Sequence, residues 1–274
     1  MRTVVALARC SHFAPTVAVT AFTTLLAVSA GASAALAGSV AAAVLAGQLS
    51  VGWSNDWLDR HRDRAAGRAD KPLVRGEVAD VTVIRGAVIA VAACVALSAR
   101  LGWRAAAAHL AAVALAWAYN AGLKSTVLSA VPYTGAFALL PVAVVVTVDP
   151  SASPPVWAVM TGALLGAGAH FTNVLPDLAS DAATGVRGLP HRLGARTSVI
   201  VAALLLAGAV LTVTMGPPGR PSGAQTVAAI VSLALVGAVV LTGSTGRLRL
   251  AFPLTLAIAG SVVASLLGVG DHLV

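Results

Sequence analysis

The sequence predicts an all-α membrane protein, and three observations support this fold class. Of the 274 residues, 58% are hydrophobic and only 10% are charged. The mean hydropathy of +0.89 is far above that of soluble domains. The apolar residues form long stretches of the length that a membrane-spanning helix needs, about 20 residues. Alanine, valine, leucine and glycine dominate these stretches, as expected where helices pack closely within a bilayer.

Nine such stretches lie between charged or Gly/Pro-containing breaks, which predicts a bundle of nine transmembrane helices in a single domain over residues 1–274. They cover residues 14–35, 38–54, 80–99, 104–122, 127–148, 155–173, 197–215, 224–243 and 250–269. The break between the first two is the weakest, because Gly31 to Gly38 is its only punctuation. Merging these two stretches leaves eight spans and reverses the orientation of everything that follows.

The basic residues predict the orientation of the chain in the membrane. The formal charge of +8 does not indicate nucleic-acid binding, because the Arg and Lys residues lie between apolar stretches and form no basic domain. Cationic loops stay in the cytoplasm. With a cytoplasmic N-terminus, only Arg100, Arg104 and Arg220 of the 18 Lys and Arg residues fall outside. We therefore expect a multi-pass cell-membrane protein surrounded by lipid, with the connections 55–79 and 174–196 in the cytoplasm.

Those two polar connections repeat one another at a constant offset of 118 residues. The identical pairs are Asn55 and Asn173, Asp59 and Asp177, Asp63 and Asp181, Gly67 and Gly185, Pro72 and Pro190, and Gly76 and Gly194. This predicts two parallel four-helix repeats, roughly residues 1–125 and 126–245, plus one further helix. Because an even number of helices separates the copies, their polar ends should face one another. Asp56 has no counterpart in the second copy.

The spacing of the acids indicates a cation site. Asn-x3-Asp-x3-Asp stacks three side chains on one face of a helix, where neighbouring carboxylates repel one another unless a cation is present. Oxygen ligands without His or Cys suit Mg²⁺, which bridges carboxylates to phosphates. Five of the chain's 10 acids fall in these motifs, so solvated loop charges are a poorer explanation. The predicted metal ligands are Asn55, Asp59, Asp63, Asp177 and Asp181.

A phosphate-containing substrate also needs fixed positive charge, for which Lys124, Lys71 and Arg68 are the candidates. Gln48 lies seven residues before Asn55, and His170 lies seven before Asp177. Both are candidates for the wall of an acceptor cavity, although an interhelical hydrogen bond explains them equally well. For His109 we favour an interhelical hydrogen bond over a place in the wall of the acceptor cavity. Intramembrane polar groups of this kind are rare and are expected to have partners.

Two segments resemble the signatures of the UbiA superfamily of intramembrane prenyltransferases. They are residues 55–63 (NDWLDRHRD) with 71–76 (KPLVRG), and residues 175–181 (LPDLASD) with 189–194 (LPHRLG). Residues 119–124 (YNAGLK) resemble that family's Tyr-x4-Lys element. The resemblance covers nearly the whole chain. It implies a helical bundle around a central cavity, with both motifs at the cytoplasmic end holding Mg²⁺ and a prenyl diphosphate.

The resemblance implies transfer of an isoprenyl group from that diphosphate to an aromatic or otherwise lipophilic acceptor. The expected catalytic residues are Asp59, Asp63, Asp177, Asp181 and Lys124. The expected substrate-binding residues are Asn55, Asp56, Tyr119, Asn173, Arg68, Lys71 and His170. A terpene cyclase of the same superfamily, acting on a prenyl diphosphate alone, fits the motifs equally well. A divalent-cation transporter is a distant alternative, because it would place its acids near the bilayer midplane rather than at helix ends.

Overall fold

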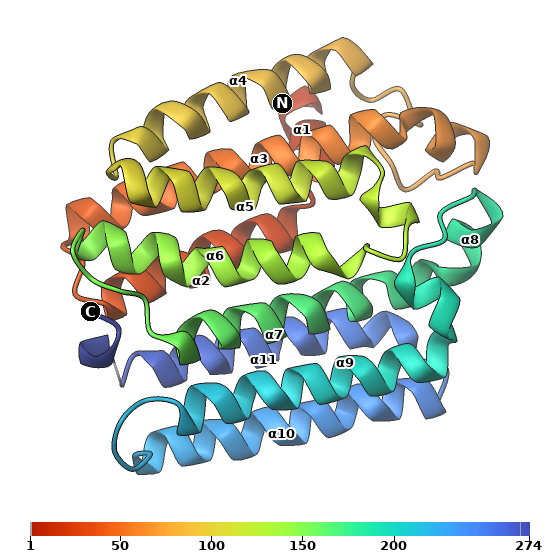
Figure 1. Cartoon of the computed structure of the whole chain (residues 1–274). Helices are drawn as coiled ribbons and strands as arrows, with labels where there is room; N and C mark the ends of the chain where they lie inside the picture. Colours follow the sequence, from red (N-terminus) through yellow and green to blue (C-terminus); the bar gives the residue numbers. More distant parts are fainter. Residues whose placement is uncertain (1, 269) are drawn as a thin grey trace.

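The computed structural model describes residues 2–268 and 270–274, and this part of the chain is helical without a β-strand (Figure 1). The first helices are α1 (Arg2–Cys10), α2 (Phe13–Ser29), α3 (Ala34–Ala65), α4 (Asp80–Ala99), α5 (Trp103–Ala121) and α6 (Ala130–Val148). They are followed by α7 (Val156–Val174), α8 (Leu178–Ala183), α9 (Leu189–Met215), α10 (Gly223–Ser244) and α11 (Ala251–Leu266). Short 3₁₀ turns at Leu123–Ser125 and Leu175–Asp177 lie close to the predicted site.

Six helices form a closed ring. Each contacts the next in the order α2, α3, α5, α6, α7, α11 and back to α2. The helices α4, α9 and α10 pack on the outside of this ring, and all the long helices lie roughly side by side (Figure 1). Because α3 and α7 run in the same direction, the two aspartate motifs lie at one end of the bundle.

The predicted all-helical membrane fold is confirmed. Each of the nine predicted stretches coincides with one long helix, although Val269 of the last stretch lies outside the described residues. Seven described helices are long and apolar enough to cross a bilayer, or eight if α1 and α2, bent by 68°, count as one span. Because α5 is not among them, nine crossings remain a prediction. Large apolar side chains such as Ile89, Leu204 and Ile230 are more than 60% exposed on outer faces, as lipid contact requires.

Local sequence signals explain where the helices begin and how closely they pack. The Ser33 hydroxyl caps α3 by accepting from the amide of Leu36, and α10 begins with a capping box of Ser222 and Gln225. On α7, any side chain at Gly162 would collide with the carbonyl oxygen of Phe137 on α6. This close approach is the small-residue packing that the composition predicts.

Candidate active site between the two aspartate motifs

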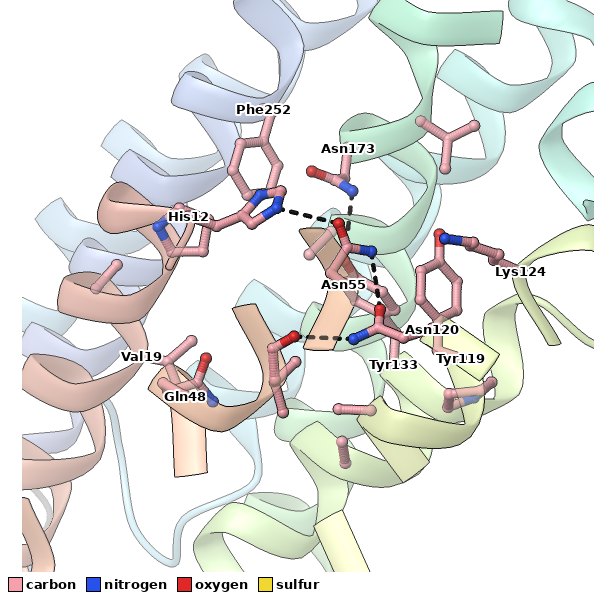
Figure 2. Close-up of a pocket in the computed structure, with 18 of the residues that line it drawn as sticks. His12, Val19, Gln48, Asn55, Tyr119, Asn120, Lys124, Tyr133, Asn173 and Phe252 are labelled. Carbon is pink, nitrogen blue, oxygen red and sulfur yellow. Dashed lines mark hydrogen bonds between the residues drawn. The ribbon is translucent and has the colours of Figure 1, made fainter. Parts of the chain in front are cut away.

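A cavity of about 490 Å³ lies inside the six-helix ring. Its walls come from α2, α3, α5, α6, α7 and α11, and both motifs contribute to it. The predicted site residues on this wall are Asn55, Asp59, Asp63, Arg68, Lys71, Tyr119, Lys124, Asn173, Asp177 and Asp181. Figure 2 shows several of them pointing toward one another from different helices. The structure therefore brings together segments that are 118 residues apart in the sequence.

The two motifs differ in backbone conformation. Motif one (residues 55–63) lies wholly within α3, so its side chains are stacked on one helical face as expected. In motif two (residues 173–181), α7 ends at Val174, a 3₁₀ turn follows and α8 begins at Leu178, so the predicted continuous helical face is wrong there. Pro176 explains the break because it lacks an amide hydrogen and its ring clashes with the preceding turn. The aligned residue in motif one is Leu58.

Both motifs end in the same helix cap. The carbonyl oxygen of Asp63 accepts from the amide of Arg68 at 3.0 Å, and that of Asp181 accepts from Val186 at 2.9 Å. The intervening Gly67 and Gly185 have φ values of 64° and 85°, a left-handed conformation that favours glycine. Each helix thus ends two residues after its last Asp, at Ala65 and Ala183, and is followed by the repeated glycine.

Asn55 is held by residues that the sequence analysis did not select. Its Nδ2 donates to Asn120 Oδ1 at 3.0 Å, and its Oδ1 lies 3.1 Å from His12 Nε2 (Figure 2). Asn120 is an amide within an apolar helix, and its place beside Tyr119 was a signal that could have identified it. His12 lies between α1 and α2, where no local pattern connects it to motif one.

Asp59 forms the strongest ion pairs of the site. Lys124 Nζ lies 2.5 and 2.6 Å from its two carboxylate oxygens, and Arg62 Nη2 donates to Oδ2 at 2.7 Å. Burial lowers the pKa of Lys124, and the adjacent Asp59 carboxylate opposes that effect. Lys124 is only 9% exposed, so this pair forms a nearly buried bridge between α3 and the turn after α5. Arg62 also lines the cavity and joins the expected cationic residues.

Arg68 and Lys71 lie in the loop that follows motif one. The pKa of Arg68 is raised, first by its hydrogen bond to Asp70 and further by the carboxylates of Asp177 and Asp63. Arg68 also lines the same cavity as the carboxylates of both motifs. Lys71 Nζ donates to Asp56 Oδ1 at 2.6 Å. Asp56 is 2% exposed and is not part of the cavity wall, in contrast to its predicted role in substrate binding, because its carboxylate is turned toward Lys71 and His12.

Motif two makes fewer contacts. Asn173 Nδ2 donates to Tyr133 Oη at 3.3 Å, and Asp181 lies 3.7 Å from His191. Within the described chain, Asp177 and Asp63 have carboxylates without a hydrogen bond or ion pair. His170 was expected on the cavity wall, but it does not line the cavity. Its fully buried ring lies 3.1 Å from Ser129 Oγ, so the interhelical hydrogen bond is the better interpretation.

The deeper part of the cavity is mostly apolar, with a few polar groups. Gln48 lines it as expected. His109 makes the hydrogen bond favoured for it, with Nδ1 2.8 Å from Ser98 Oγ, and also lies on the wall. Tyr119 and Tyr133 meet edge to face with ring centroids 5.1 Å apart. A second, apolar cavity of about 80 Å³ shares wall residues with the first, including Phe22 and Phe137. The site therefore combines charged side chains from both motifs with apolar side chains deeper in the wall.

The donor set at the mouth fits a hard divalent cation. No group of three or more His, Cys, Asp or Glu side chains in the described chain is close enough to hold a metal by itself. Mg²⁺ does not require one, because it is usually bound by one or two carboxylates together with substrate phosphates. The Asp63 carboxylate lines the cavity and has no hydrogen bond or ion pair within the described chain. A cation shared with the substrate would pair it there.

Residues 16–250 match the family model of the UbiA prenyltransferase family. The chain belongs to this family. No curated protein sequence matches the chain. UbiA-type structures share its fold. A UbiA homologue from Aeropyrum pernix K1 matches with a TM-score of 0.75 and 22% identity, over 91% of this chain and 96% of that one.

Two further structures match nearly full length. One is a UbiA homologue from Archaeoglobus fulgidus bound to GPP and Mg²⁺, with a TM-score of 0.74 and 18% identity, over 98% of this chain and 99% of that one. The other is a digeranylgeranylglyceryl phosphate synthase, with a TM-score of 0.67 and 13% identity, over 98% and 99%. At these identities the likeness concerns the fold. With its apolar helices, membership of the UbiA family makes this chain a multi-pass membrane protein.

Proposed function

We propose that this UbiA-family protein is a Mg²⁺-dependent prenyltransferase that transfers an isoprenyl group from a prenyl diphosphate to an aromatic acceptor. One observation carries the proposal: the carboxylates of both motifs and the cations Arg62, Arg68, Lys71 and Lys124 surround the mouth of a single apolar cavity. Such a mouth suits a diphosphate, and such a chamber suits its hydrocarbon tail. The related structure bound to GPP and Mg²⁺ supports this choice of ligands.

The proposed Mg²⁺ ligands are Asn55, Asp59, Asp63, Asp177 and Asp181, which line the mouth. Bound there with the diphosphate, Mg²⁺ would neutralise the charge that develops on the leaving group. Lys124 and Arg62 are placed to donate to the diphosphate oxygens, and Arg68 approaches both motifs. Tyr119 on the wall is proposed to contact the substrate beside Lys124.

In the proposed reaction, the bond between C1 of the prenyl chain and the diphosphate oxygen breaks first. The apolar wall excludes water from the allylic cation, which would otherwise be hydrolysed. A ring carbon of the acceptor then forms the new carbon–carbon bond, and the ring loses a proton. Gln48 and His109 are polar groups of the chamber that are placed to orient the acceptor.

We further propose that both motifs and the N-terminus face the cytoplasm. The loop after motif one carries Arg68, Lys71 and Arg75, while Arg187 lies in the loop after motif two and Arg192 in the first turn of α9. The positive-inside rule favours a cytoplasmic location for such loops. Accessibility of single cysteines introduced at Arg75 and at Arg220, tested in intact cells with a membrane-impermeant thiol reagent, checks this orientation. Labelling of the cysteine at the Arg75 position from outside the cell would show the opposite orientation.

The activity is tested with purified protein in nanodiscs, given geranyl diphosphate, a panel of phenolic acceptors and Mg²⁺. Wild type should release diphosphate and form a prenylated acceptor, with loss of both when EDTA is added. Asp59→Ala and Asp177→Ala should each lower turnover at least ~10²-fold. Asp149→Ala, in the connection between α6 and α7, is the matched control. Full activity in either motif variant would refute the proposal, and a hydrocarbon product without any acceptor would identify a cyclase instead.

A further inference from the structure

Asp56 is the one acid of motif one that the proposed reaction does not use, and its surroundings suggest another role. Its Oδ1 accepts from Lys71 Nζ at 2.6 Å and lies 3.1 Å from His12 Nε2. Its Oδ2 is buried without a hydrogen-bond partner among the described residues. The aligned position in motif two is the apolar, buried Val174. The carboxylate therefore has a role that is specific to motif one. Only motif one is preceded by the segment that contains His12.

His12 adopts an unfavourable backbone conformation that needs stabilising contacts. It is the only non-glycine residue of the described chain with a positive φ, at 54°, and it lies at the 68° bend between α1 and α2. Residues with a Cβ rarely adopt this region, and such strain often marks functional sites. The bend rests directly on α3, where any side chain at Gly52 would collide with the carbonyl of Ser11. Gly52 lies three residues before Asn55, so the bend brings the His12 ring to motif one.

The His12 ring completes a chain of hydrogen bonds that fixes the Asn55 amide. Asn120 Nδ2 donates to the carbonyl of Val51 at 2.9 Å and to Ser54 Oγ at 3.0 Å, so its Oδ1 must face Asn55. Asn55 Nδ2 donates to that oxygen, and its own Oδ1 therefore faces His12. The two groups nearest His12 Nε2 are acceptors, Asn55 Oδ1 and Asp56 Oδ1 at 3.1 Å each, and Lys71 Nζ lies farther away at 3.5 Å, so this nitrogen is placed to donate to the two oxygens. Asp56 is one of those acceptors and thus holds the ring in place.

Asp56 is not needed to attach α1 to the bundle. Arg9 forms an ion pair with Glu77 at 2.9 Å and donates to the carbonyl of Asp70 at 2.8 Å. Trp53 Nε1 donates to the carbonyl of Leu7 at 2.8 Å. These contacts fasten α1 to the loop after motif one and to α3. The remaining role of Asp56 is to place the His12 ring and the Lys71 ammonium group at the cavity mouth.

We propose that Asp56 and His12 are positioning residues, which orient the Asn55 amide and the Lys71 ammonium group for binding of the metal and the diphosphate. This inference rests on the proposed function. It assigns Asp56 an indirect role through His12 and Lys71, without contact to the substrate. It also makes the N-terminal segment part of the active site, although that segment lies outside both motifs.

The test measures ligand binding as well as turnover. Equilibrium dialysis with a non-reactive thio analogue of geranyl diphosphate gives the Mg²⁺ concentration for half-maximal binding. His12→Ala and Asp56→Asn should each raise that concentration ~10- to 100-fold, as expected for groups that orient metal ligands. The double variant should be no worse than Asp56→Asn alone, because the two act through one contact. His12→Asn, which tolerates the left-handed backbone and keeps an amide donor, should restore part of the loss.

The control is Arg9→Gln, which weakens the attachment of α1 and leaves the Asp56 contacts intact. It should bind the analogue with the wild-type Mg²⁺ dependence. The proposal is overturned if His12→Ala and Asp56→Asn also keep that dependence, or if Arg9→Gln shifts it as strongly as they do. Wild-type protein that fails to bind the analogue with Mg²⁺ would overturn the proposed function itself. Wild-type binding with unshifted variants would overturn only the positioning roles.

Discussion

The two aspartate motifs share one Asn and two Asp residues at the same spacing, yet the surroundings of these residues differ. In motif one, Asn55 has partners on both sides, and Asp59 is paired with Lys124 and Arg62. In motif two, Asn173 has one hydrogen bond at 3.3 Å, and no side chain in the described chain bonds the Asp177 carboxylate. Motif one lies on an unbroken helix, whereas motif two is interrupted after Val174.

The difference indicates that the two motifs have different tasks. In motif one, Asn55 and Asp59 are preorganised by protein contacts, so these two ligands are held before any substrate arrives. Asp177 and Asp63 have no hydrogen bond or ion pair within the described chain and are available for cations from solution, which favours binding of metal and diphosphate together. The three predictions that follow test this comparison, from the largest expected effect to the smallest.

The largest expected difference is in stability after loss of one carboxylate. Asp59→Ala leaves the buried Lys124 without its partner, which should lower the free energy of unfolding by ~3–5 kcal/mol. Asp177→Ala breaks no such pair and should change the free energy of unfolding by less than ~0.5 kcal/mol. Thermal and denaturant unfolding in the same detergent measures both. Equal losses would show that motif one is no more preorganised than motif two.

The second prediction concerns Pro176 and the aligned Leu58, which account for the different backbone conformations of the two motifs. Leu58→Pro places a proline inside α3 and should destabilise the protein by ~3 kcal/mol or more. Pro176→Leu removes the break in motif two and should leave stability nearly unchanged. It should still lower turnover by up to ~10²-fold, because the Asp177 and Asp181 carboxylates would be displaced. Full activity of Pro176→Leu would show that the break is not required.

The smallest effect concerns the loop after motif one. The hydrogen bonds from Arg68 hold the pKa of Asp70 below its ordinary value. A depressed folded pKa stabilises the protein above the unfolded pKa of ~3.9, and the contribution is lost as the pH falls through the lower folded value. Asp70 is largely exposed, so Asp70→Asn should cost less than ~1 kcal/mol at pH 7 and nothing well below pH 3. Unfolding curves at both pH values measure this, and a loss that persists at low pH would exclude an ionic origin.

Local patterns were sufficient for much of this molecule. Stretches of apolar residues predicted the long helices, and a constant offset predicted that the acids of motifs one and two lie together. Gly67 and Gly185, each four residues after the last Asp of its motif, form identical helix caps, which were not predicted. Pro176 was also a visible signal, because a proline two residues after Val174 disfavours a continuous helix.

The sequence by itself determined the helices, their caps and the paired motifs, because these depend on hydropathy, glycine and proline within a few residues. Only the tertiary structure decided which side chains meet. It placed His12 against Asn55, turned Asp56 away from the cavity, and paired Asp59 with Lys124, 65 residues further along. It also turned His170 toward Ser129 instead of the cavity. Such contacts depend on how whole helices pack against each other, and no local spacing encodes that.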